Sequence, residues 1–203
     1  MLQISTIEPS TLELLVSLQK TDILKSTRLV GGTALALQIG HRLSIDLDFF
    51  GQIEEDTEKI AENLTEQGFD VKWESNSKNI HIFKINEIKT DIVNYIYPWI
   101  EDMIEDNGVR LAGLKDIAAM KIAAITNRGS KKDFIDIYFL LNHFSLKEIM
   151  DLYLEKYPDG SSFLAYKSLS YFVDAENQIM PKMLIPTKWE DVKKRIIAEV
   201  RQI

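Results

Sequence analysis

The sequence has no cysteine among its 203 residues. This absence excludes disulfides, zinc–thiolate sites, iron–sulfur clusters and thiol nucleophiles. The chain also lacks an apolar run approaching the ~18 residues that a membrane span requires, and its first residues show no basic segment leading into an apolar one. We therefore expect a cytoplasmic protein that does not enter a membrane.

Several common catalytic motifs are also missing. There is no Gly-x-Ser-x-Gly elbow, no Walker lysine loop and no His-Glu-x-x-His helix, and the three histidines are scattered. These absences disfavour a serine hydrolase, a P-loop enzyme and a zinc protease. What is present is a globular composition, with 45% hydrophobic and 27% charged residues, which is enough for a sizeable core.

Charge is distributed unevenly. The net charge is −7, but residues 1–110 hold 10 basic and 19 acidic residues, whereas residues 111–203 hold 14 basic and 12 acidic ones. An acidic part can bind metal ions, and a basic part can bind phosphates. This asymmetry favours phosphate chemistry.

The apolar patterns predict an α+β fold with two parts, a core over 1–110 with a small mixed sheet, and a helical region over 111–203 that packs on it. In the core, we expect strands at 28–30, 43–50, 80–85 and 88–97 and helices from Ser10, over 34–39 and over 57–67. In the second part, we expect helices over 114–127, 132–143 and 162–176, one from Ser145 and one from Thr187. Pairs three residues apart predict capping boxes at Ser10/Glu13, Ser145/Glu148 and Thr187/Glu190.

The segment LSIDLDFF alternates strictly and carries two acids, Asp46 and Asp48. On a strand, their carboxylates project from the same face, with the Ser44 hydroxyl beside them. Neighbouring carboxylates repel each other, so the arrangement is tolerable at the mouth of a sheet if Mg²⁺ neutralises it. Taken alone, the pattern is weak evidence for a metal site, because chance gives roughly one Asp-x-Asp in such a chain. The alternative is an exposed strand face bearing two solvated charges.

A glycine turn precedes the acids. Gly31, Gly32 and Thr33 lie between a predicted strand and a helix start, where backbone N–H groups and the threonine hydroxyl can bind a phosphate. Arg42 could hold a terminal phosphate, although a plain surface arginine fits the pattern equally well. Asp91 is an acid within an apolar strand, and it is expected to meet a cation or to face the same cleft.

Together these segments resemble a known family. Gly31-Gly32-Thr33, Arg42-Leu43-Ser44 and Asp46-Leu47-Asp48-Phe49-Phe50 are similar to the glycine turn and metal motif of the DNA polymerase beta-like nucleotidyltransferase superfamily, and more closely to its AbiEii/AbiGii toxin branch of type IV toxin–antitoxin pairs. In the second half, KIAAITNRGSKKDFIDIYFLL resembles that branch's helical motif of a lysine, an arginine and Lys-Asp-x-x-Asp. The matching positions there are Lys121, Arg128, Lys132, Asp133 and Asp136.

The resemblance implies a nucleotidyltransferase core followed by a helical bundle, and an enzyme that moves a nucleotidyl group from a nucleoside triphosphate to an acceptor hydroxyl. It implies Mg²⁺ held by Asp46 and Asp48. Asp91 is expected to be a third ligand because of its position on its strand, not because of a motif. The resemblance also implies that Lys121, Arg128 and Lys132 help bind the nucleotide and that Asp133 is a catalytic acid or base. The acceptor would be an RNA or tRNA end, and a cognate antitoxin would restrain the activity.

Two alternatives stay open. An Asp-x-Asp glycosyltransferase would bind a metal and a nucleotide sugar, although it would usually need a larger nucleotide-binding domain. A non-catalytic protein could keep the fold as a scaffold for RNA or a partner protein. For the charged residues after Gly113, the alternative is a salt-bridged helix pair without a catalytic role.

Overall fold

The computed structural model describes residues 1–202, which form two compact units. The β unit comprises residues 1–39, 44–96 and 103–112, and the helical unit comprises residues 40–43, 97–102 and 113 onwards. The short segments 40–43 and 97–102 belong to the helical unit, although they lie in the first half of the chain.

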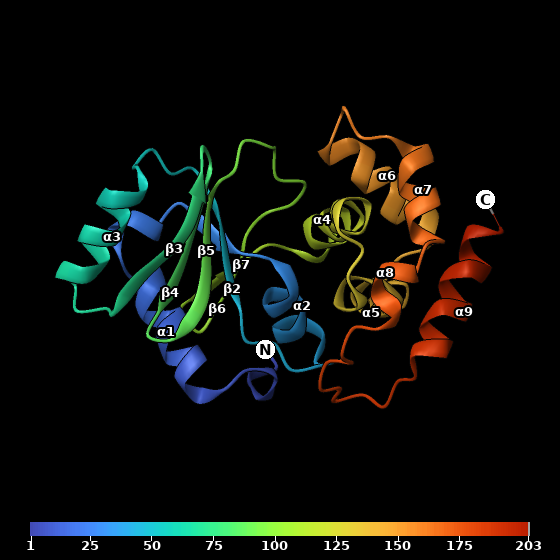
Figure 1. The fold of residues 1–203 in the computed structure, drawn as a ribbon, viewed down its shortest axis with the longest axis horizontal. Coiled ribbons are helices and arrows are strands. Elements are labelled where there is room, and N and C mark those ends of the chain that lie inside the picture. The colour runs from blue at the N-terminus through green and yellow to red at the C-terminus, as the bar shows by residue number, and fades with distance from the viewer. Residues whose placement is uncertain (203) are drawn as a thin grey trace. The chain divides into compact units, whose positions relative to one another are not determined.

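The β unit contains a seven-stranded mixed sheet in the order β3-β4-β5-β2-β1-β7-β6 (Figure 1). Its strands are β1 (Thr27–Leu29), β2 (Leu47–Gly51), β3 (Val71–Ser77), β4 (Ile80–Ile85), β5 (Ile88–Asn94), β6 (Ile104–Asp106) and β7 (Val109–Leu111). Its helices are α1 (Pro9–Gln19), α2 (Gly31–Ile39) and α3 (Thr57–Glu66), with 3₁₀ turns at Ile4–Thr6 and Asp22–Leu24. The predicted α+β class is confirmed.

One face of this sheet carries the core. Phe49 pairs in register with Ile92, and Ile92 pairs with His81, so all three side chains point to the same side. All three are buried, as are Ile60 and Leu64 of α3. Along each strand, the residues that alternate with these point to the opposite face of the sheet. Asp48 of β2 and Asp91 of β5 are among them.

The predicted β4–β5 hairpin is confirmed, and so is its turn. Asn86 and Glu87 have φ values of 48° and 67°, the left-handed pair that a tight two-residue turn requires. Helix α3 also has its predicted extent, with Asp56 as N-cap and Gly68 at φ 92° just beyond its end. The short strands β6 and β7, and the polar edge strand β3, have no clear apolar pattern and were not expected.

The expected strand over 43–50 is shorter, because β2 begins only at Leu47. Ahead of it, the backbone N–H of Ser44 donates to the carbonyl of Thr6 and not to a strand partner. Alternation therefore fails at the start of the segment. Ile45, which the pattern assigned to the inner face, is 58% exposed.

The helical unit contains α4 (Leu114–Asn127), α5 (Lys131–Leu140), α6 (Leu146–Lys156), α7 (Ser162–Leu169), α8 (Val173–Glu176) and α9 (Trp189–Val200). The capping box at Ser145 and Glu148 is confirmed. The helix expected over 162–176 is interrupted between α7 and α8.

The predictions of capping boxes at Ser10/Glu13 and Thr187/Glu190 are wrong. Helix α1 has Glu8 as its N-cap, because Pro9 already occupies the first turn. Helix α9 begins after Lys188, and the Thr187 hydroxyl donates to the Ile185 carbonyl instead of capping the helix.

Candidate active site

The glycine turn and the acid pair meet in the β unit. Gly31 opens α2 with φ 69°, and a Cβ added there would collide with the Asp48 carboxylate. The backbone N–H of Val30 also donates to the Asp48 carbonyl at 2.9 Å. Glycine is required at position 31 on two counts, the left-handed backbone and the close approach of the acid.

The first turn of α2 lies at this point. The leading N–H groups of a helix have no acceptor within the helix and carry its partial positive charge, so they suit an anion. Gly31 and Gly32 supply such groups beside an acid. This arrangement can hold a phosphate on the amides while the carboxylate holds a cation next to it.

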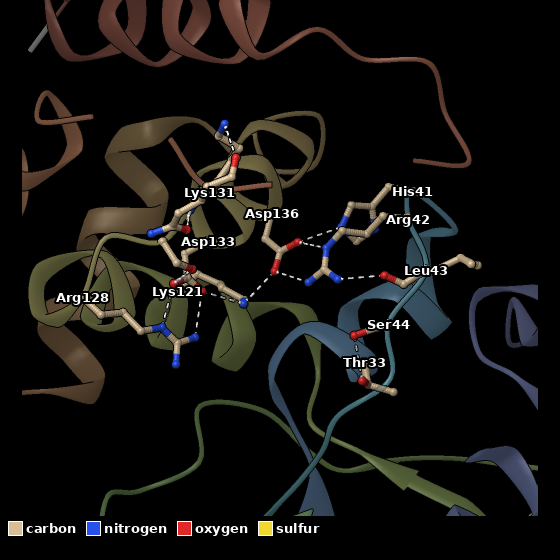
Figure 2. A network of polar contacts seen from close by, with 12 residues as sticks. Thr33, His41, Arg42, Leu43, Ser44, Lys121, Arg128, Lys131, Asp133 and Asp136 are labelled. Carbon is tan, nitrogen blue, oxygen red and sulfur yellow. Dashed lines mark hydrogen bonds and ion pairs between the residues drawn. The ribbon is translucent and has the colours of Figure 1, made fainter. Parts of the chain in front are cut away.

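The Thr33 hydroxyl makes two contacts within the β unit. The Thr33 side chain is buried, and its hydroxyl donates to the backbone carbonyl of Asp46 and is hydrogen-bonded to the Ser44 hydroxyl at 2.9 Å (Figure 2). Thr33 thus holds the segment that carries Asp46 in place. Ser44 takes part in the same contact.

Asp91 lies beside Asp48. The two residues are register partners on the parallel strands β2 and β5. Their Cα atoms are therefore about 5 Å apart, and their side chains leave the same face of the sheet. Asp46, Asp48 and Asp91 are here called the acidic site. From its sequence position, Asp91 was expected to meet a cation or to face the same cleft as the acid pair.

Both oxygens of Asp91 contact the ammonium of Lys89, at 2.7 and 2.8 Å. Burial lowers the pKa of Lys89, but the hydrogen bond to Asp91 and the charges of Asp91, Asp48 and Asp46 raise that pKa by more. Lys89 therefore carries its charge within electrostatic reach of the whole acidic site. Within residues 1–202, no three Asp, Glu or His side chains are already gathered as a metal-binding group.

In the helical unit, six side chains form a second cluster. The members of this helical charge network are His41, Arg42, Lys121, Arg128, Asp133 and Asp136. Asp136 lies at its centre, fully buried, and accepts hydrogen bonds from Nε and Nη2 of Arg42 at 2.8 and 3.0 Å (Figure 2). Lys121 Nζ is 2.6 Å from the same carboxylate.

Burial would raise the pKa of Asp136, but the charges of Arg42 and Lys121 and hydrogen bonds from His41 and Arg42 hold it well below the ordinary value. The expected binding of a phosphate by Arg42 is not favoured here, because its side chain is only 2% exposed and its donors are already engaged. Its guanidinium is part of the interior of the helical unit.

Lys121 lies within α4 and Arg128 is the C-cap residue just beyond it, and both contact Asp133. The Lys121 ammonium lies 3.0 Å from Asp133 Oδ1, and Arg128 Nε donates to Asp133 Oδ2 at 2.9 Å. The Ser130 hydroxyl donates to Asp133 as well, at 2.6 Å. Lys121 is buried, whereas the Arg128 side chain is 67% exposed.

These contacts bear on the role expected of Asp133 as a catalytic acid or base. Burial would raise its pKa, but Lys121, Arg128 and Ser130 lower it well below the usual value. A carboxylate so strongly stabilised in its charged form is a weak base. Lys132, the other cation of this motif, is exposed.

His41 is the remaining member of the helical charge network. Its Nε2 lies 2.8 Å from Asp136 Oδ1, and its ring is fully buried. Burial lowers the pKa of His41 despite the neighbouring carboxylate. The buried Nδ1 of His41 has no hydrogen-bond partner among the described residues.

Comparison with known proteins identifies the family. The model of the nucleotidyl transferase AbiEii toxin family, a type IV toxin–antitoxin system, matches residues 13–202. The chain belongs to this family. Membership makes it a nucleotidyltransferase-family enzyme and a toxin-family member, and it confirms the resemblance found in the sequence. It favours this chemistry over the glycosyltransferase alternative.

Relatives span nearly the whole chain. An uncharacterized protein of Aquifex aeolicus is 38% identical over 180 residues, 86% of each chain. The crystal structure of JHP933 from Helicobacter pylori has a TM-score of 0.57 and 18% identity, covering 97% of this chain and 92% of that one. MenT4, a nucleotidyltransferase toxin of Mycobacterium tuberculosis, has a TM-score of 0.59 and 16% identity, covering 93% and 80%. At these identities the two structures show the shared fold.

None of the helices within residues 1–202 is long and apolar enough to cross a bilayer.

Proposed function

We propose that the chain transfers a nucleotidyl group from a nucleoside triphosphate to an acceptor hydroxyl at an RNA end such as that of tRNA, in a reaction that depends on Mg²⁺. The observation that carries this proposal is the close approach of Gly31 to the Asp48 carboxylate, which brings the start of α2 to the acid pair. A triphosphate needs both an anion site and a cation site, and these residues supply the two side by side.

The donor chemistry of the acidic site fits Mg²⁺. Its side chains offer only carboxylate oxygens, the ligands that this hard cation prefers, and Asp48 and Asp91 are already register partners. Asp46 and Asp48 would hold the ion. When bound, Mg²⁺ neutralises charge on the triphosphate and on the attacking oxygen.

The remaining steps belong to the chain itself. The first amides of α2 bind and orient a phosphate, and Thr33 keeps the Asp46 backbone in place through its hydrogen bond. Arg128, whose side chain is largely exposed, is proposed to assist in phosphate binding. Asp133 and Asp136 are proposed to position Lys121 and Arg128, because their carboxylates are saturated with cationic donors. A cognate antitoxin is proposed to restrain the activity, as type IV toxin–antitoxin membership implies.

The test is a labelling reaction. The protein is incubated with each α-³²P-labelled nucleoside triphosphate, Mg²⁺ and total RNA, and the products are resolved by electrophoresis. We expect labelled RNA together with released pyrophosphate, and loss of label with Asp46→Asn or Asp48→Asn. The matched control is Asp70→Asn, an exposed acid of the same unit whose nearest cation is Lys72. If no nucleotide labels RNA, or if the asparagine variants label as well as the wild type, the proposal fails.

A further inference from the structure

Lys89 lies where the acidic site would receive a cation. Lys89 and Asp91 are two residues apart on β5, so both side chains leave the same face of the sheet. The Lys89 ammonium contacts both carboxylate oxygens of Asp91, which in turn is the register partner of Asp48. No motif pointed to this lysine, although the alternation that placed Asp91 on the face also places Lys89 there.

We propose that Lys89 is a built-in counter-cation of the acidic site, which a divalent metal ion must displace from Asp91 in order to bind all three carboxylates. The inference rests on the proposed function for the metal itself and adds the residue that sets how tightly the metal is held. Lys89 is thus a positioning residue that acts through Asp91.

The physical reason is competition for the same oxygens. Without a metal, the carboxylates of Asp48 and Asp91 on one face repel each other, and the charge of Asp46 adds to this repulsion. The Lys89 ammonium relieves part of it. A metal that recruits Asp91 must take at least one oxygen from Lys89 and then lies close to a like charge. The Lys89 side chain is 46% exposed, so it has room to move into solvent when displaced.

The chain offers a matched control. Lys84 is the register partner of Lys89 across the β4–β5 hairpin, and its side chain therefore leaves the same face. Its ammonium pairs with Glu87 and not with the acidic site. Removing Lys84 deletes one positive charge from the same hairpin while leaving Asp91 and its partner in place.

The test is calorimetric titration of the full chain with MnCl₂ and with MgCl₂, without nucleotide. Lys89→Met should lower the dissociation constant on the order of tenfold, Lys89→Arg should stay near the wild type, and Lys84→Met should change nothing. Lys89→Gln provides a second uncharged variant, and a larger metal-induced rise in the unfolding temperature gives an independent measurement.

Unchanged or weaker metal binding in both uncharged Lys89 variants would overturn the inference while leaving the proposed transferase reaction standing. An equal fall in the metal dissociation constant of Lys84→Met would also overturn it. The effect would then come from removing any positive charge on the hairpin and not from Lys89 itself. If neither the wild type nor any variant takes up metal, the inference and the metal dependence of the proposed function fail together. If metal affinity shifts as expected but RNA is never labelled, only the proposed reaction fails.

Discussion

Replacing Gly31 by alanine tests the link between the glycine turn and the acid. Alanine at φ 69° costs about 1–2 kcal/mol because its Cβ clashes with the backbone in the left-handed region. The new Cβ would also overlap the Asp48 carboxylate, which must then move. A displacement near 1 Å at a reacting site can reduce the rate by about 100-fold. We therefore expect Gly31→Ala to lose labelling activity by about that factor.

Gly108 separates the two causes. It has φ 77° in the same unit, and a Cβ there would meet nothing within 4 Å. Gly108→Ala should show the same backbone cost of about 1–2 kcal/mol, measured by urea unfolding, and should keep its activity. Gly31→Ala should cost more, because the carboxylate must be displaced as well.

A double-mutant cycle with Asp48→Ala isolates the collision. Without the Asp48 carboxylate, alanine at position 31 should cost only the backbone strain, so the coupling free energy should be about 1–3 kcal/mol. Equal costs in the two backgrounds would show that the two residues do not meet. Activity of Gly31→Ala within threefold of the wild type would refute the proposed geometry of the site.

Four further predictions follow from the contacts described above. Asp136→Asn should lose about 3–5 kcal/mol, because it leaves a buried guanidinium without its carboxylate, whereas the exposed Asp151→Asn should lose less than about 1 kcal/mol; denaturant titrations measure both. The pKa of Asp136 is lowered in the folded state, so its stabilisation is full above the unfolded-state pKa of about 4 and is lost as pH falls, and acid titration should show a smaller loss in Asp136→Asn. Thr33→Val should reduce the labelling rate by about tenfold, the equivalent of one lost hydrogen bond, while Thr33→Ser should retain activity. Arg128→Ala should weaken triphosphate binding with little loss of stability, since its side chain is exposed; unchanged nucleotide affinity by calorimetry would remove it from the phosphate site.

The family and much of the fold could be predicted from the sequence, because local patterns carried them. The β4–β5 hairpin follows from two apolar runs joined by Asn86 and Glu87, which tolerate positive φ. The Ser145 capping box depends only on residues three apart. The glycine turn and the two acids, taken together with the lysine, arginine and Lys-Asp-x-x-Asp motif of the second half, were enough to identify the family.

What each charged side chain contacts was decided only by the tertiary structure. Arg42 and Arg128 are both arginines beside family motifs, yet the first is buried against Asp136 and the second is exposed, because burial depends on packing between distant segments. Asp136 lies 94 residues from Arg42, and no local pattern encodes such a partner. The same holds for Asp48 and Asp91, whose adjacency exists only because β2 and β5 pair in parallel. Sequence determines which side of a strand a residue takes, but the pairing of strands determines which charges meet there.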